Sequence, residues 1–317
     1  MHDLPTTDQI LAQRAVIDPV FLDSPTMRHP ALDEALDCAC TLKIETLNPV
    51  RSFKGRGTEA FMAAQPRSTT GVIATSSGNF GQGLARAATR RAVSATIVCP
   101  ADANPLKVAA MRRLGATVDL ADPREGEGKD LARGMASDQG LVFVEDGAHW
   151  EIAAGAGGIA QELTEAGLRP SVLLVQVGDG ALAIGVGSWL KARSPETRVI
   201  GVVAAGAPAL ALSLEAGHPV EAAADTIADG MAIHRPVSGV VELLAQCVDE
   251  VLVVDDRAIR AGMRLLEDAA GVLTEPSGAA GVAAIMTNRE RFAGIDVATI
   301  VTGSNVNPAL RDLDAPA

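Results

Sequence analysis

The sequence predicts an α/β protein of two lobes, in which each lobe is an open, mainly parallel sheet flanked by helices. Short apolar runs alternate with helical stretches from residue 71 to residue 317, and this alternation is typical of strand–helix–strand units. The apolar runs are continuous, as strands that are buried on both faces require. Two such series, 71–147 and 148–317, predict two lobes with a cleft between them.

The first series begins with the strand GVIAT at 71–75, which a glycine-rich turn connects to a helix at 80–92. A second strand, ATIVCP at 95–100, precedes a helix at 104–116 that has Pro105 near its start and Gly115 near its end. The runs TVDLAD (117–122) and LVFVED (141–146) predict two further strands with a helix between them.

The second series continues with the strand SVLLVQV at 171–177, a helix to about Arg193, and the strand RVIGVV at 198–203. EVLVVD at 250–255 leads into a helix at 257–271, a second helix begins at Pro276, and VATIVTG at 297–303 is the last strand. Ligands of open α/β sheets bind beyond the carboxyl ends of the strands. The loops that run from strands into helices are therefore the first places to look for chemistry.

The composition argues against several classes of partner. Apolar residues make up 48% of the chain and charged residues 21%, which is typical of a folded globular protein. The net charge of -12 argues against nucleic acid and anionic membrane as partners. The N-terminus lacks the basic and apolar regions of a secretion signal, and the longest uncharged apolar run, 199–214, is shorter than the roughly 20 residues of a membrane helix. We therefore expect a cytoplasmic protein.

The first loop of interest, TSSGNFGQG at 75–83, leads from a strand into a helix. Free backbone N–H groups and the positive end of the helix dipole meet there, which suits a carboxylate or a phosphate. A capped helix with glycines for tight packing explains the same pattern, and this loop alone does not separate the two interpretations.

The second loop, VQVGDGALAIGVG at 175–187, also leads from a strand into a helix and matches the dinucleotide pattern GxGxxA. Dinucleotide binding requires an acidic residue about 20 residues further on, at the end of the next strand. No acidic residue occurs from 199 to 205. A single phosphate is therefore favoured, and a nicotinamide-dependent dehydrogenase is only a remote alternative.

The stretch LNPVRSFKGRG at 47–57 places Lys54 directly after Phe53 and between two arginines. A carboxylate site, a monophosphate site and a lysine together suit pyridoxal phosphate, whose aldehyde captures a lysine. The chain resembles the threonine/serine dehydratase and serine racemase branch of the fold-type II pyridoxal-phosphate enzymes over nearly its whole length. Five segments carry this resemblance in the family's order: LKIETLNPVRSFKGRG (42–57), TSSGNFGQG (75–83), VGDGAL (177–182), TIADG (226–230) with EPSGA (275–279), and VTGSN (301–305).

The resemblance implies a tryptophan synthase beta-like fold with pyridoxal 5'-phosphate as the cofactor. Residues 1–70 and 148–317 would form a large cofactor-binding domain, and residues 71–147 a small domain that closes over the substrate. Lys54 would be the Schiff-base lysine that later shuttles protons, and neighbouring Arg51 and Arg56 would favour its neutral amine. Phe53 and Gly230 would cover the two faces of the cofactor ring.

The remaining site residues follow from the same resemblance. Thr302 would meet the pyridine nitrogen, and a hydroxyl at that place favours β-elimination over a long-lived carbanion. Asn79 would bond the ring hydroxyl, and Ser77 matches the serine that acts on the opposite face in racemising members. The backbone of Ser76, Ser77, Gly78 and Asn79 would hold the substrate carboxylate, and the phosphate loop would consist of Gly178, Asp179, Gly180, Ala181 and Leu182.

The sequence departs from the family pattern at several positions. Asp179 interrupts the glycines of the phosphate loop, and because its carboxylate would repel a phosphate, we expect the side chain to face away. The metal positions of racemase-like members are Val203 and Ala209 here, so we expect no metal. Gly147 and Ala156 are smaller than the family's residues, which suggests a different substrate from serine or threonine.

Three polar or aromatic residues have two open interpretations. His149 and Trp150 are candidate specificity residues, but a surface or packing role explains each of them better. Glu275 is either a polar group near the ring or an N-terminal cap of the helix that follows it.

The resemblance implies an ammonia-lyase (dehydratase) that eliminates water from a 3-hydroxy amino acid, such as threonine, serine or a relative, to give a 2-oxo acid and ammonia. An amino-acid racemase or a β-replacement enzyme on the same fold is the alternative. The partner is a small amino acid, and homodimers are the family's habit. Only about a dozen residues follow VTGSN, from which we expect an unregulated, catabolic-type enzyme.

Overall fold

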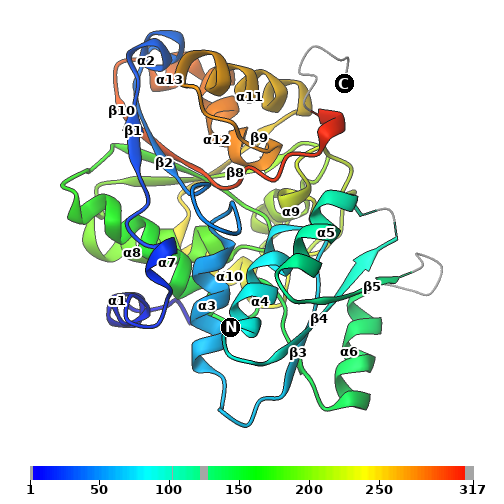
Figure 1. The fold of residues 1–317 in the computed structure, drawn as a ribbon. Coiled ribbons are helices and arrows are strands. Elements are labelled where there is room, and N and C mark those ends of the chain that lie inside the picture. Colours follow the sequence, from blue (N-terminus) through cyan, green and yellow to red (C-terminus); the bar gives the residue numbers. More distant parts are fainter. Residues whose placement is uncertain (1–2, 102, 122–127, 311–317) are drawn as a thin grey trace.

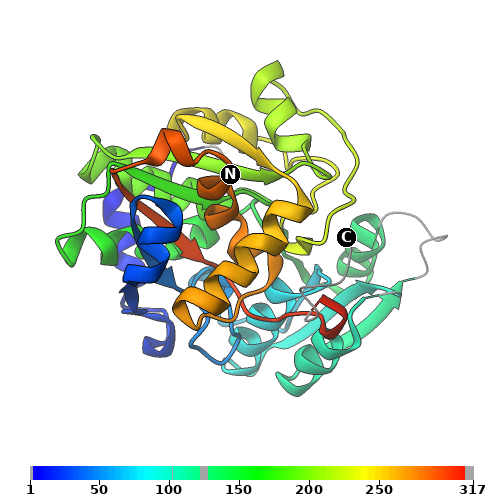
Figure 2. The same cartoon turned by 90° about the horizontal axis from the view of Figure 1, so that it is seen from above.

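Two sheets organise the chain in the computed structural model, which describes residues 3–101, 103–121 and 128–310. The larger sheet has six strands in the order β1-β2-β10-β7-β8-β9, and the smaller has four in the order β5-β4-β3-β6. In both views the segment that carries the smaller sheet lies beside the rest of the chain (Figure 1, Figure 2). The predicted fold class, with mainly parallel sheets flanked by helices, is confirmed.

The larger sheet is parallel except at one edge, where β1 pairs antiparallel with β2. The sequence interpretation did not include these two strands. The strand β1 has only three residues and alternates between exposed and half-buried positions, so it has no continuous apolar run. The other pairings are parallel, as the continuous apolar runs predicted. The strands are β1 (Thr26–Arg28), β2 (Ala39–Ile44), β7 (Val172–Gln176), β8 (Arg198–Ala204), β9 (Glu250–Val254) and β10 (Asp296–Val301).

Helices cover both faces of the larger sheet and separate its core into two clusters. The helix α8 packs on one face together with α7, and both contribute to the first cluster. The helix α12 packs on the other face under α11, and both contribute to the second. These helices are α7 (Trp150–Glu165), α8 (Ala181–Arg193), α11 (Asp256–Ala270) and α12 (Pro276–Thr287).

The smaller sheet is wholly parallel, and its strands come from residues 71–143. The strand β6 follows β5 in the chain but pairs with β3, on the opposite side of β3 from β4. The expected strand at 141–146 is only two residues long, and residue 122 of the expected strand at 117–122 lies outside the described residues. The elements are β3 (Gly71–Thr75), α4 (Asn79–Thr89), β4 (Ser94–Pro100), α5 (Pro105–Arg113), β5 (Thr117–Ala121), α6 (Gly128–Gln139) and β6 (Val142–Phe143).

The helix α3 (Lys54–Ala64) packs against both α4 and α7, so it connects the elements around the two sheets. The predicted division into domains at residues 70 and 148 stays a prediction. Within the described residues, no helix is long and apolar enough to cross a membrane. The remaining elements are α1 (Thr7–Gln13), η1 (Pro19–Phe21), α2 (Pro30–Leu36), α9 (Ala209–Ala216), η3 (Asp229–Met231), α10 (Val240–Cys247), α13 (Arg289–Phe292) and η4 (Pro308–Leu310).

Candidate active site

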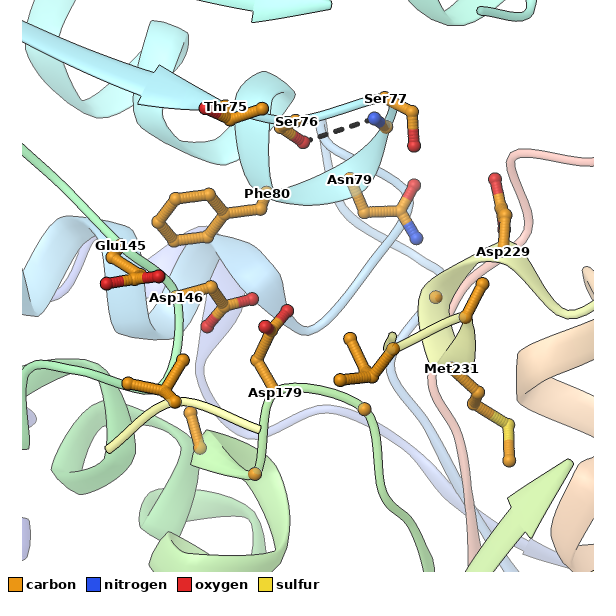
Figure 3. Close-up of a pocket in the computed structure, with 18 of the residues that line it drawn as sticks. Thr75, Ser76, Ser77, Asn79, Phe80, Glu145, Asp146, Asp179, Asp229 and Met231 are labelled. Atoms are coloured by element: carbon orange, nitrogen blue, oxygen red, sulfur yellow. Dashed lines mark hydrogen bonds between the residues drawn. The ribbon is translucent and has the colours of Figure 1, made fainter. Parts of the chain in front are cut away.

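One pocket of about 1130 Å³ collects the predicted site residues. The loop between β3 and α4 forms one wall, and the loop between β7 and α8 forms another, as the carboxyl-end rule predicted (Figure 3). All thirteen predicted residues line it, although their individual roles stay predictions. They are Phe53, Lys54, Ser76, Ser77, Gly78, Asn79, Gly178, Asp179, Gly180, Ala181, Leu182, Gly230 and Thr302.

Lys54 is the first residue of α3, and its side chain enters the pocket rather than the solvent. Its Nζ lies 4.8 Å from the centre of the Phe53 ring and forms an ion pair with the carboxylate of Asp146. The two arginines expected to surround Lys54 engage other groups: Arg56 is fully buried and pairs with Glu45 and Glu162, and Arg51 donates from Nε to Ser304 Oγ. The charge that faces Lys54 is therefore negative.

Asp146 is a site residue that the sequence interpretation missed. It is 8% exposed, and its Oδ1 has no hydrogen-bond partner among the described residues. It follows β6, and because β6 lies next to β3 in the sheet, their carboxyl ends meet at one edge. The strand rule would have found it if it had been applied to acidic loops as well as glycine-rich ones.

The loop before α4 is partly satisfied by its own side chain. Ser76 Oγ accepts hydrogen bonds from Gly78 N at 3.1 Å and from Gly81 N at 3.0 Å (Figure 3). Ser76 N donates to Val98 O. These contacts narrow the predicted carboxylate site to the N–H groups of Ser77 and Asn79, which lie at the start of the helix.

A hydrogen-bond network fixes the amide of Asn79. Its Nδ2 donates to Glu275 Oε1 at 2.5 Å, and its Oδ1 accepts from Asn305 Nδ2 at 2.8 Å. Glu275 Oε2 accepts from Asn305 N. The capping interpretation of Glu275 is wrong, because its side chain makes no cap hydrogen bond to α12. Burial raises the pKa of this carboxyl, while Lys107 opposes the shift. Glu275 is thus a buried group that orients Asn79 in the pocket.

Glycines shape the opposite side of the pocket. A Cβ on Gly178 would lie 2.3 Å from Gly230 O, and a Cβ on Gly230 would lie 2.9 Å from Ser277 Oγ. Ser277 is 4% exposed, and its Oγ has no partner among the described residues. Thr302 is also buried and lines the pocket. The close approach of Gly178 and Gly230 therefore leaves no room for side chains on this side, and Ser277 and Thr302 contribute hydroxyl groups to the lining.

The loop before α8 departs from its prediction at Asp179. The carboxylate of Asp179 points into the pocket toward Asp146 (Figure 3), so the expectation that it faces away is wrong. Burial, followed by the charge of Asp146, raises the pKa of Asp179 to about 6, against the opposing effect of Lys129 and Lys54. Gly180 has a φ of 96°, and this left-handed conformation starts α8.

Lys107 on α5 is a second residue that the sequence interpretation missed. It is 5% exposed and forms an ion pair with Asp229, next to Gly230. Burial lowers its pKa, but Glu275 and Asp229 outweigh this effect, so the pKa is raised. A Cβ on Gly78 would lie 3.3 Å from Lys107 Nζ. The ammonium group of Lys107 therefore lies next to the loop that is predicted to bind the substrate carboxylate.

The candidate specificity residues lie elsewhere. His149 and Trp150 line a separate pocket of about 420 Å³, where His149 packs edge-on against Phe61. Val203 and Ala209 are buried apolar residues. In the part of the chain that the structure describes, no group of three His, Cys, Asp or Glu residues is placed to hold a metal ion.

The two sheets and the pocket lined by Lys54 are typical of enzymes that bind a cofactor through a lysine, and sequence comparison identifies the family. Residues 17–303 match the family described as pyridoxal-phosphate dependent enzyme. The chain is 34% identical over 289 residues to the biosynthetic L-threonine dehydratase of Escherichia coli (strain K12), covering 90% of this chain and 56% of the relative. It is 35% identical to the L-threonine ammonia-lyase of Thermotoga maritima, covering 86% and 68%. The chain belongs to the pyridoxal-phosphate dependent enzyme family.

Solved structures agree with this assignment. The threonine deaminase of T.th. has a TM-score of 0.86 at 30% identity, with 95% of this chain and 98% of that chain covered. Maize serine racemase has a TM-score of 0.91 at 27% identity, with 97% and 95% covered. The predicted family resemblance is confirmed. The chain spans about half the length of the Escherichia coli relative, 56%.

The residues present fit pyridoxal phosphate. Phe53, Gly230, Ser277 and Thr302 line one pocket, so Phe53 and Gly230 would bound a ring there, and the unpartnered Ser277 Oγ and the Thr302 hydroxyl would be its polar partners. No side chain caps the N-terminus of α8, whose N–H groups are available to a phosphate. Lys54 enters the same pocket from the other side.

We expect Gly178→Ala to bind pyridoxal phosphate about 5- to 150-fold more weakly. The added Cβ would lie 2.3 Å from Gly230 O, so the backbone at Gly230 must shift. Overpacking of this kind costs about 1–3 kcal/mol, which we expect to appear as lost binding free energy. Fluorescence titration measures the affinity. Gly134→Ala is the control, because it lies in α6 with nothing within 4 Å of its added Cβ. Equal affinities for the two variants would contradict this interpretation of the loop.

Proposed function

We propose that this chain is a pyridoxal-phosphate dependent ammonia-lyase that eliminates water from a 3-hydroxy amino acid, giving a 2-oxo acid and ammonia. One observation carries the proposal: Lys54, the start of α4 and Thr302 line a single pocket. The names of the Escherichia coli and Thermotoga maritima relatives, a threonine dehydratase and a threonine ammonia-lyase, support the same reaction.

Each part of the pocket has a distinct task in this reaction. The bound cofactor supplies an electron sink for the α-carbon of the substrate. The N–H groups of Ser77 and Asn79 orient the substrate carboxylate at the positive end of α4. Lys54 Nζ takes the α-proton and delivers a proton to the departing hydroxyl, and such positioned transfer contributes about 100- to 10,000-fold. Thr302, which lines the pocket, would offer the ring nitrogen a neutral hydroxyl and not a carboxylate.

The test has two arms. In the first, the purified protein is loaded with pyridoxal phosphate and reduced with borohydride, and the adduct is located by peptide mapping. We expect the adduct on Lys54, and an adduct on any other lysine would refute the site assignment. In the second, a coupled 2-oxo-acid assay compares serine, threonine, 3-hydroxyaspartate and phenylserine. If none of these substrates yields a 2-oxo acid, dehydratase activity is excluded for that set.

Racemisation is a second candidate function, and the position of Ser77 favours it. Its hydroxyl faces the pocket near Asn79 (Figure 3), and maize serine racemase is among the similar structures. Chiral chromatography after incubation with L-serine distinguishes the two: D-serine without pyruvate selects the racemase, and pyruvate without D-serine selects the lyase.

We also infer a cytoplasmic homodimer whose small-molecule partner is an amino acid. The absence of a membrane-spanning helix among the described residues is compatible with this inference. Light scattering should give a mass of about twice 32.5 kDa. A mass equal to that of one chain would refute the dimer.

A further inference from the structure

Three carboxylates converge at one end of the active-site pocket. Glu145 and Asp146 follow β6, and Asp179 precedes α8. The carboxylates of Asp146 and Asp179 point toward one another in the pocket (Figure 3). Asp146 is 8% exposed, and its Oδ1 is buried without a partner among the described residues. A buried carboxylate oxygen without a partner costs free energy unless another group, such as a proton on a neighbouring acid, completes its hydrogen bonding.

The same end of the pocket offers hydrogen-bond donors to an anion. The first hydrogen bond within α8 runs from Ile184 N to Gly180 O. The N–H groups of Ala181, Leu182 and Ala183 therefore precede the helical ladder, and no side chain caps them. A phosphate suits this helix terminus, yet it would stand beside Asp146 and Asp179. The N–H donors of α8 thus favour an anionic ligand, whereas the carboxylates of Asp146 and Asp179 repel one.

The cations at this end form direct ion pairs with two of the three carboxylates. Lys54 pairs with Asp146, and Lys129 Nζ lies 3.0 Å from Glu145 Oε1. Arg133 Nη2 lies 3.0 Å from Glu145 Oε2. Asp179 makes no ion pair with any described residue. A phosphate that enters this space therefore meets one carboxylate that makes no direct ion pair with a described cation.

We propose that the phosphate of the cofactor binds here together with one proton. Asp179 carries this proton and donates a hydrogen bond to a phosphate oxygen. Protonation removes the repulsion between Asp179 and the phosphate and turns an acceptor into a donor. The inference rests on the proposed function only through its cofactor. It explains how an aspartate is compatible with a phosphate-binding loop.

The electrostatics of the pocket support this inference. Asp146 and Glu145 raise the proton affinity of Asp179, Lys129 and Lys54 lower it, and burial dominates, so that its pKa is raised to about 6. A phosphate would raise that pKa further, because it adds negative charge. The affinity of the wild-type protein for the cofactor should therefore fall as the pH rises above about 6.

The matched variant is Asp179→Asn. An asparagine has the same shape and donates a hydrogen bond at every pH. The phosphate itself ionises in solution in the same way for both proteins, so its ionisation cancels in the ratio of the two dissociation constants. That ratio isolates the proton on Asp179.

The experiment measures binding of pyridoxal phosphate to the full chain by fluorescence from pH 6 to pH 8. Relative to wild type, we expect Asp179→Asn to bind about 100-fold more tightly at pH 8 but only about 2-fold more tightly at pH 6, since a pKa of about 6 sets the protonated fraction. Calorimetry in two buffers should show one proton more taken up by wild type at pH 8. Pyridoxal, which lacks the phosphate, should show no such pH-dependent ratio.

The control variant is Asp268→Asn, which removes the same charge from the exposed surface of α11. It should bind like wild type at every pH. A pH-independent ratio for Asp179→Asn, or weaker binding by that variant at pH 8, would overturn the inference while leaving the lyase proposal intact. No binding of pyridoxal phosphate by wild type at any pH would overturn both.

Discussion

Lys54→Ala should lower the rate of 2-oxo-acid formation by at least about 1,000-fold. The variant loses the amine that captures the cofactor and the group that moves protons at the α-carbon, and positioned proton transfer alone contributes about 100- to 10,000-fold. The visible absorbance band of the loaded protein should disappear at the same time. A coupled dehydrogenase assay and an absorbance spectrum measure the two effects.

Lys54→Arg is the control for charge. Asp146 is buried and pairs with Lys54, so alanine leaves its charge without a partner, whereas arginine keeps a cation there. Both variants should be inactive, but only the alanine variant should lose stability in urea. An active Lys54→Ala protein that retains its absorbance band would exclude Lys54 as the cofactor lysine.

Arg56→Ala should lower the free energy of unfolding by about 3–5 kcal/mol, because it breaks a buried ion network. Arg56 is 0% exposed and donates to Glu45 at 2.8 and 2.9 Å and to Glu162 at 2.7 and 2.9 Å. Among the described residues, the alanine leaves Glu45 without a cation, while Glu162 keeps Lys43 at 2.6 Å and a longer contact with Arg14. Urea denaturation measures the loss.

Arg90→Ala is the matched control. Arg90 also contacts two carboxylates, those of Asp18 and Glu59, but its side chain is 52% exposed. Solvent screening limits such pairs to about 0–1 kcal/mol. If the two alanine variants lost equal free energy of unfolding, burial would be excluded as the cause of the larger loss expected for Arg56→Ala.

Periodicity and loop composition predicted most of the strands and two walls of the pocket. The alternation of apolar runs and helices predicted β3, β4, β7, β8, β9 and β10 close to their observed bounds. The glycines and serines after β3 and β7 predicted two of the pocket walls, because helix termini expose unpaired N–H groups. These features depend on residues close together in the sequence.

Asp146 shows why the site was incomplete. It follows β6, a strand of two residues whose neighbour in the chain is β5 but whose partner in the sheet is β3. The pairing that brings Asp146 to Lys54 is therefore a property of strand order, which local periodicity does not contain. Lys107 and Asp229 are likewise 122 positions apart and meet only in the folded chain.

Strand periodicity and five short segments of the sequence were enough to predict the fold class, the cofactor family and a lysine that lines the pocket. The charge around that lysine depends on contacts that form only in the folded chain. Arg56 turns away to Glu45 and Glu162, while Asp146 and Asp179 turn inward. The direction of a side chain depends on neighbours that the fold brings from distant segments, so Asp179, which was expected to face away, points into the pocket instead.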